Sequence, residues 1–137
     1  MADHRLLIIE DDPKIADLVA SVAGEMEFET RTASGLGALE AYDHFKPHCI
    51  VLDILMPEMD GLEVLQALKE RVSEARIIIL SGGENSYRRM AEHLGEAGGL
   101  VIAANIAKPF RLNEMRSALE KIRARPQTET MPSEKAG

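Results

Sequence analysis

The sequence has little of the material from which disulfide frameworks, aromatic platforms or membrane spans are built. It contains one cysteine, no tryptophan, two tyrosines and three phenylalanines among 137 residues. A single cysteine, Cys49, allows no intramolecular disulfide, so we expect a cytoplasmic protein in a reducing compartment. The longest apolar runs, such as Leu6–Ile9, are far shorter than the ~20 residues of a membrane span and too short for a secretory signal, so neither insertion nor export is expected.

Positive charge is also scarce. Sixteen Lys and Arg residues stand against 23 Asp and Glu residues, which gives a formal net charge of -7. Affinity for nucleic acid depends mainly on Lys and Arg side chains that neutralise phosphates, and the few aromatic residues offer little surface for base stacking. We therefore expect no direct binding of nucleic acid.

The length and composition predict one domain. The chain is 45% apolar and 28% charged, and at this size folding buries roughly two thirds of the extended chain's surface, which is enough for a core without a disulfide or structural metal. The last twelve residues, PQTETMPSEKAG, contain two prolines and almost nothing to bury. We predict a domain over residues 4–125 and a disordered tail over residues 126–137.

Apolar periodicity predicts alternating strands and helices. Segment 28–32 alternates apolar or β-branched with charged residues, which is typical of a strand at a sheet edge. Four almost wholly apolar runs predict strands buried on both faces: Leu6–Ile9, Cys49–Leu52, Ile77–Leu80 and Leu100–Ala104. Apolar residues at helical spacing predict helices around Ile15–Val22, Leu36–Phe45, Leu62–Leu68, Tyr87–Leu94 and Leu112–Ile122, with Asp12 and Pro13 as N-cap and first residue of the earliest. Five strand–helix repeats indicate an α/β fold, a doubly wound parallel sheet between two helix layers.

Charged and hydroxyl side chains follow the predicted strands. Glu10 and Asp11 come after the first strand, Asp53 after the third, Ser81 after the fourth and Lys108 shortly after the fifth. The carboxyl ends of parallel strands meet at one edge of the sheet, where such folds bind their ligands. We therefore expect these side chains to gather in one site.

Carboxylates gathered in this way need a cation. Two like charges 4 Å apart repel by about 4 kcal/mol at an effective dielectric of 20. Lys108 supplies one positive charge, and Mg²⁺, which prefers oxygen ligands and keeps several waters, would supply two more. This chemistry suits phosphoryl transfer in which one carboxylate acts as the nucleophile.

The stretches LLIIEDDP, IVLDILMPEMDG, IIILSGG and AKPF, in this order, resemble the receiver domain of two-component response regulators. The resemblance covers about residues 4–125. It implies a flavodoxin-like (βα)5 sheet with strand order 2-1-3-4-5, which agrees with the edge-like second strand. Because twelve tail residues cannot form an output domain, we expect either a stand-alone receiver or a receiver separated from its output domain.

The resemblance also implies a role for each matching residue. Asp53 is the expected phosphoacceptor, Asp11 a direct Mg²⁺ ligand, and Glu10 a metal-site acid acting through water. Leu55 is expected to give its backbone carbonyl to the metal.

The remaining matched residues are expected to contact the phosphoryl group or to shape the site. Ser81 and Lys108 would bind phosphoryl oxygens, and a cis bond between Lys108 and Pro109 would aim the ammonium into the site. Pro57 and Gly61 are expected to be structural residues of the loop after the acceptor.

The chain departs from the family at the position three residues before the lysine. The family commonly has Tyr or Phe there as a rotameric switch, whereas this chain has Asn105. The interval from Ser81 to Lys108 is also longer than usual, which predicts a fourth helix about one turn longer. How the switch is read out is left open.

The main hypothesis is a phosphorylation switch. A histidine kinase or phosphotransfer protein would donate the phosphoryl group, and a downstream protein would bind the fourth helix, fifth strand and fifth helix. We expect no enzymatic activity on external substrates. One alternative, a haloacid-dehalogenase-type phosphohydrolase, would need an acid where the chain has Leu55. A second, a phosphorylation-independent interaction module, is motivated by Asn105.

Overall fold

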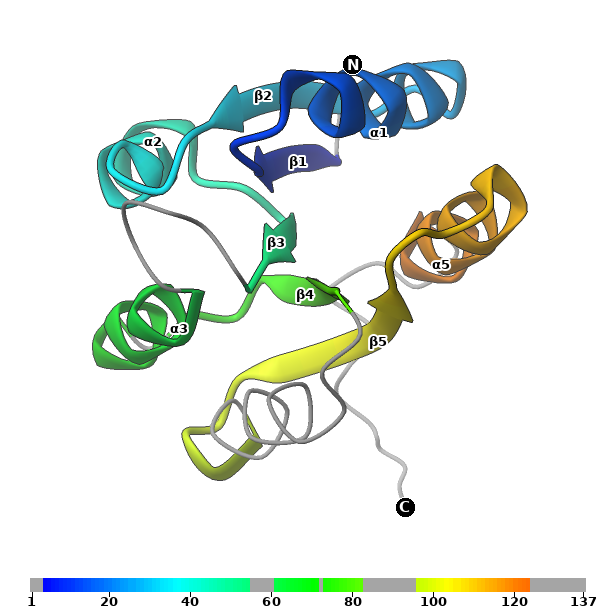
Figure 1. Ribbon diagram of the computed structural model, residues 1–137. Helices are drawn as coiled ribbons and strands as arrows, with labels where there is room; N and C mark the ends of the chain where they lie inside the picture. The colour runs from blue at the N-terminus through cyan, green and yellow to red at the C-terminus, as the bar shows by residue number, and fades with distance from the viewer. Residues whose placement is uncertain (1–3, 55–60, 72, 83–95, 124–137) are drawn as a thin grey trace.

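The computed structural model describes residues 4–54, 61–71, 73–82 and 96–123 and contains one five-stranded parallel sheet (Figure 1). The strand order is β2-β1-β3-β4-β5, which confirms the predicted fold class. The strands are β1 (Arg5–Ile9), β2 (Glu29–Ala33), β3 (Cys49–Asp53), β4 (Arg76–Ser81) and β5 (Val101–Ala107).

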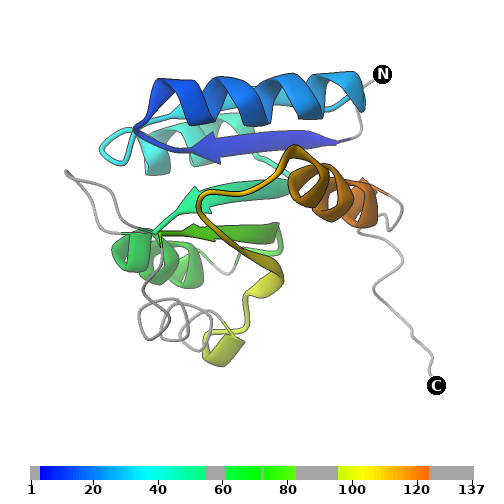
Figure 2. The same ribbon diagram turned by 45° about the vertical axis from the view of Figure 1, so that its right-hand side comes forward.

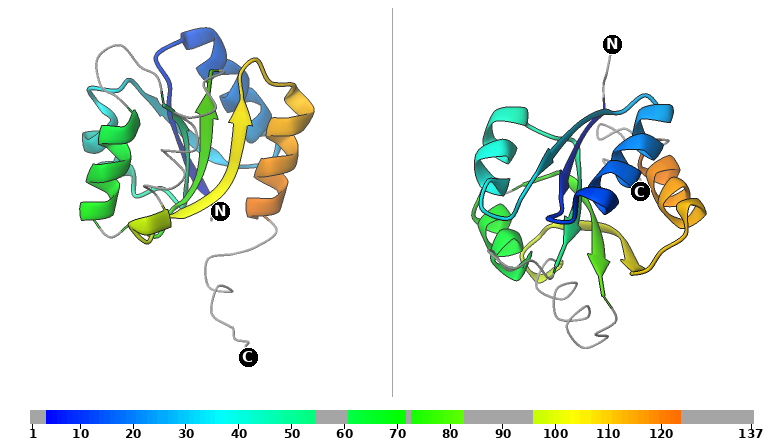
Figure 3. Two further views of the ribbon diagram at one scale, coloured as in Figure 1. Left: turned by 60° about the horizontal axis from the view of Figure 1, so that its bottom comes forward. Right: turned by 45° about the horizontal axis from the view of Figure 1, so that its top comes forward.

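Helices cover both faces of the sheet, so the domain has three layers (Figure 3). One face carries α1 (Pro13–Glu25) and α5 (Leu112–Arg123), and the other carries α2 (Ala38–Phe45) and α3 (Gly61–Glu70). The predicted fourth helix around Tyr87–Leu94 and the predicted tail lie outside the described residues. No helix in the described part of the chain is long and apolar enough to cross a membrane.

The central strands are buried on both faces, as their continuous apolar runs predict. Successive side chains of a strand point to opposite faces, so each strand contributes to two separate cores. In β1, Leu6 and Ile8 pack towards α1 and α5, whereas Leu7 and Ile9 pack towards α2 and α3. All five residues of β3 and all six of β4 are buried. The carboxyl ends of these strands therefore project from a rigid base.

The last strand differs from its prediction. Leu100–Ala104 was expected to be buried on both faces, but β5 spans Val101–Ala107 and the Val101 side chain is 44% exposed. The physical reason is its place at the edge of the sheet, where one side has no neighbouring strand. Ile77 pairs with Ile102 and Ile78 with Ala104, so Ala103 forms a bulge.

Three leucines predicted on apolar helix faces are also exposed. Leu36 is 71% exposed because it lies before α2, in a turn that the Gly37 N–H closes on the Ser34 carbonyl at 3.1 Å. Leu18 and Leu112 are each 44% exposed. The start of α1 agrees with its prediction: Pro13 is the first residue, and the Asp12 carboxylate accepts a hydrogen bond from the Lys14 N–H at 2.9 Å.

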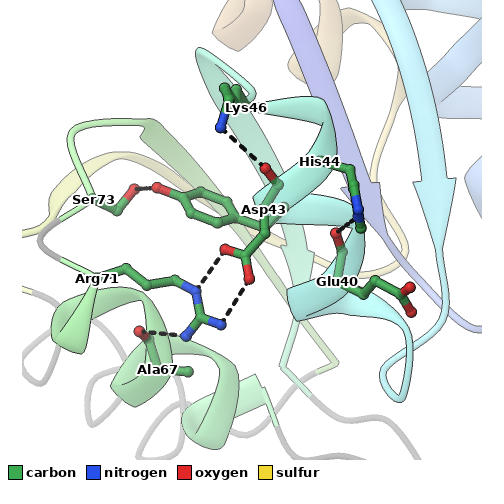
Figure 4. A network of polar contacts seen from close by, with 8 residues as sticks. Glu40, Asp43, His44, Lys46, Ala67, Arg71 and Ser73 are labelled. Atoms are coloured by element: carbon green, nitrogen blue, oxygen red, sulfur yellow. Dashed lines mark hydrogen bonds and ion pairs between the residues drawn. The ribbon is translucent and has the colours of Figure 1, made fainter.

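Polar contacts join α2 to the end of α3 (Figure 4). The Arg71 guanidinium donates to both carboxylate oxygens of Asp43, at 2.9 and 3.0 Å. The Tyr42 hydroxyl donates to Ser73 Oγ at 2.7 Å, just before β4. These contacts fix the end of the molecule opposite the predicted site.

Cys49 lies at the start of β3 and is completely buried. Its Sγ donates to the Arg5 carbonyl at 3.7 Å, and burial raises the pKa of the thiol to about 12. Because the thiolate is the reactive form, Cys49 is a core residue and not a nucleophile.

We expect the Cys49 thiol to resist alkylation by iodoacetamide at pH 8 in the folded protein and to react once the chain is unfolded in urea. Mass spectrometry should detect one adduct per chain after unfolding and almost none before. Rapid labelling of the native protein, at a rate independent of its stability, would contradict the assignment.

Candidate functional site

The carboxyl ends of β1, β3 and β4 point to the same edge of the sheet (Figure 2). Glu10 directly follows β1, Asp53 is the last residue of β3 and Ser81 is the last residue of β4. Since these strands are neighbours in the sheet, their ends lie together. Lys108 follows β5, and its N–H donates to the Ser81 carbonyl at 2.7 Å, which extends the pairing of β4 and β5 by one residue.

One ammonium group joins two carboxylates at this edge. Lys108 Nζ lies 3.2 Å from Glu10 Oε1 and 3.2 Å from Asp53 Oδ2. The side chain of Lys108 is 22% exposed, whereas those of Glu10 and Asp53 are only 2% and 4% exposed. The peptide bond between Lys108 and Pro109 is cis. The structure thus brings together three of the residues predicted for the site.

Burial and neighbouring charges shift the pKa values of Glu10 and Lys108. Burial raises the pKa of Glu10, and the charge of Asp53 raises it further, although the Asp12 N–H and Lys108 act in the opposite direction. Burial lowers the pKa of Lys108, but the attraction of Asp53 and Glu10 outweighs it, so this pKa is raised. The ion pair therefore favours the charged form of Lys108 more than that of Glu10, because Glu10 is the more deeply buried partner.

The two carboxylate oxygens of Asp11 differ in their contacts. Its Oδ1 accepts a hydrogen bond from the Gly35 N–H at 3.0 Å. Its Oδ2 is buried and has no hydrogen-bond partner among the described residues. Sequence analysis missed Gly35, and no local pattern could have placed it beside a residue 24 positions earlier.

These oxygens fit the donor set of Mg²⁺. The ion keeps several waters and needs only one or two carboxylates, and the unsatisfied Asp11 Oδ2 is a buried donor of this kind. Within the described ranges, no group of three or more His, Cys, Asp or Glu side chains encloses a metal position. Leu55, the expected carbonyl ligand, and Pro57 lie outside the described residues.

Gly61 lies where no side chain fits. Its N–H donates to the Ile54 carbonyl at 2.7 Å. A Cβ at this position would lie 2.5 Å from Ile54 Cα and 2.9 Å from the Asp53 carbonyl oxygen. The start of α3 is therefore held against the end of β3, immediately beside Asp53.

Asn105 occupies the expected switch position in β5. It pairs with Ile79, and Ser81 pairs with Ala107, so Asn105 and Ser81 lie on the same face of the sheet. Asn105 Oδ1 is buried and has no hydrogen-bond partner in the described part of the chain. Leaving a buried acceptor without a hydrogen bond costs about 1–3 kcal/mol of folding free energy. The Asn105 side chain is therefore subject to a hydrogen-bonding requirement that a phenyl ring at this position would not have.

Comparison with known protein families identifies the family to which the chain belongs. The family model of the response regulator receiver domain matches residues 6–120. The chain belongs to this family. It is the receiver domain of a two-component response regulator, and phosphorylation and Mg²⁺ are typical of such domains.

The receiver domain has relatives of similar length. It is 32% identical over 125 residues to chemotaxis protein CheY of Listeria monocytogenes, covering 85% of this chain and 96% of CheY. It is 32% identical over 123 residues to sporulation initiation phosphotransferase F of Bacillus subtilis, covering 88% and 94%. The crystal structure of the NtrX receiver domain from Brucella abortus matches with a TM-score of 0.75 and 29% identity, covering 85% and 96%.

Replacing Gly61 by alanine should strain the junction of β3 and α3. We expect Gly61→Ala to lose about 1–3 kcal/mol of unfolding free energy, the usual cost of overpacking, in urea denaturation. Gly24→Ala is the matched control: a Cβ on Gly24 has no atom within 4 Å, and alanine in α1 should stabilise by about 0.5 kcal/mol. Equal stability of the two variants would contradict the close approach at Gly61.

Removing the charge of Glu10 should stabilise the metal-free domain at neutral pH. The raised pKa means that ionised Glu10 is less favourable in the folded than in the unfolded state. The wild-type protein therefore gains stability as the pH falls through this raised pKa towards 4.5, whereas Glu10→Gln does not.

Urea unfolding in EDTA at pH 7 should show Glu10→Gln to be more stable than wild type, and the difference should shrink near pH 4.5. Glu120→Gln, on the exposed side of α5, is the control and should leave the stability unchanged at both pH values. A Glu10→Gln variant less stable than wild type at pH 7 would show that the bond to Lys108 outweighs burial.

Proposed function

We propose that Asp53 is the phosphoacceptor of this receiver domain. The observation that carries the proposal is the shared ammonium: Lys108 Nζ lies 3.2 Å from Asp53 Oδ2 while also contacting Glu10. A phosphoryl group on Asp53 would add negative charge beside a cation that is already in place. The same arrangement supports Lys108 as the group that binds a phosphoryl oxygen.

The transfer is a substitution at phosphorus. An oxygen of the Asp53 carboxylate attacks the phosphoryl group of a phosphohistidine on a histidine kinase or phosphotransfer protein. The new P–O bond forms as the P–N bond breaks, and the imidazole nitrogen keeps the electron pair. Charge develops on the transferred oxygens, and the Lys108 ammonium stabilises it without a proton transfer.

Asp11, Asp53 and the Leu55 carbonyl would hold Mg²⁺, with Glu10 acting through water. The unsatisfied Oδ2 of Asp11 supports the first of these roles. When bound, the ion supplies additional positive charge to the equatorial phosphoryl oxygens. Removal of Mg²⁺ by EDTA should therefore stop phosphate uptake.

The response to phosphorylation would begin at Ser81. Its hydroxyl is on the same face of the sheet as Asn105, at the end of the strand that pairs with β5. Movement of Ser81 towards the phosphoryl group would change the surroundings of β5 and the fourth helix. We propose a downstream protein as the reader of β5, α5 and this helix.

A phosphorylation-independent interaction module is the second candidate, because Asn105 cannot act as an aromatic switch. The two functions predict different NMR spectra on addition of beryllofluoride and Mg²⁺. A switch should show shifts that spread from Asp53 to β5, whereas a module without a switch should show changes only around Asp53 or none.

Incubation with acetyl phosphate and Mg²⁺ should add one phosphate per chain, detected by intact-protein mass spectrometry. We expect Asp53→Ala to take up none and Lys108→Ala to take up far less. Asp43→Ala is the matched control, because its carboxylate lies between α2 and α3 at the opposite end of the molecule and should leave the uptake unchanged. Phosphate uptake by Asp53→Ala would refute the assignment.

A further inference from the structure

The hydrogen bond from Gly35 to Asp11 joins the candidate metal site to the loop between β2 and α2. The Gly35 N–H donates to Asp11 Oδ1 at 3.0 Å, and Asp11 Oδ2 has no partner among the described residues. We propose that Gly35 is a positioning residue for Mg²⁺: its N–H fixes the Asp11 carboxylate and keeps Oδ2 available for the metal. This inference rests on the proposed role of Asp11 as a metal ligand.

The position of Gly35 is itself fixed by backbone hydrogen bonds. The Glu10 N–H donates to the Ala33 carbonyl at 3.1 Å, which ties the end of β1 to the end of β2. Gly37, two residues after Gly35, donates its N–H to the Ser34 carbonyl at 3.1 Å and so closes the turn. Gly35 therefore lies in a closed turn anchored to the residue before Asp11.

In metalloproteins, hydrogen bonds of this kind orient the side chains that bind the metal. A backbone N–H that donates to a carboxylate is charge-assisted, and Gly35 is buried, so water competes with it poorly. A group that orients a metal ligand typically changes metal affinity by about 10–100-fold when it is removed. A carboxylate already held by one oxygen loses less rotational freedom when the other binds the ion.

The coupling must work in both directions. If the turn positions Asp11 for Mg²⁺, then bound Mg²⁺ stabilises the turn by the same free energy. The turn carries Leu36, a large apolar side chain that is 71% exposed. Metal occupancy and the presentation of Leu36 on the surface are thus linked.

A pair of substitutions at one position isolates the N–H group. Gly35 is the second residue of the turn, the place where proline is favoured, so Gly35→Pro removes the donor while the turn can persist. Gly35→Ala retains the donor and is the matched control. In Mg²⁺ titrations followed by NMR without any phosphate donor, we expect Gly35→Pro to bind about 10-fold more weakly than Gly35→Ala, or weaker still.

Hydrogen exchange of the unmodified turn gives an independent measurement. In the wild type, Mg²⁺ should slow exchange of the Gly35 amide, and Asp11→Ala should abolish this protection. Asp12→Ala should not, because the Asp12 carboxylate accepts from Lys14 instead. This measurement decides the question if Gly35→Pro fails to fold.

Equal Mg²⁺ affinities of the proline and alanine variants would overturn the inference, as would a Gly35 amide whose exchange ignores Mg²⁺. Either result together with normal phosphate uptake at Asp53 would leave the proposed function intact. Slowed exchange of Gly35 without phosphate uptake would contradict the proposed function alone.

Discussion

The candidate site depends on one ammonium group that is shared by two buried carboxylates. Glu10 directly follows β1 and Asp53 ends the neighbouring strand β3, so the sheet brings the two carboxylates together despite their repulsion. Lys108 Nζ, 3.2 Å from each, is the group that makes this tolerable. The Lys108 N–H donates to the Ser81 carbonyl, which holds the Asp53 carboxylate, the ammonium and the Ser81 residue at one edge of the sheet.

The charge of the two carboxylates is incompletely compensated. Burial still raises the pKa of Glu10, and Asp11 Oδ2 remains unsatisfied among the described residues. Such a site fits the proposed binding of a divalent cation, which would stabilise the folded state relative to the metal-free protein. The fully buried strands β3 and β4 and the tight junction at Gly61 hold this unfavourable arrangement in place.

The edges of the sheet are less constrained than its centre. β5 has a bulge at Ala103 and an exposed Val101, and it carries Asn105, whose buried Oδ1 has no hydrogen-bond partner among the residues that the structure describes. At the other edge, the turn after β2 exposes Leu36 while its Gly35 N–H contacts Asp11. At both edges of the sheet, residues near the charged site are thus followed or accompanied by exposed apolar side chains, unlike those of the buried central strands.

The sequence by itself predicted the sheet and the gathering of Glu10, Asp53 and Lys108 at one of its edges. Continuous apolar runs marked the central strands, and Asp12–Pro13 marked the start of α1, because burial on both faces and helix capping leave local patterns. The family motifs supplied the strand order and named Asp53, Glu10 and Lys108. Only the tertiary structure decided that Lys108 bridges the other two, that Gly35 holds Asp11, that Leu36 is exposed and that β5 has a bulge at Ala103. These features arise from contacts between residues far apart in the chain, and no local pattern encodes which segments become neighbours.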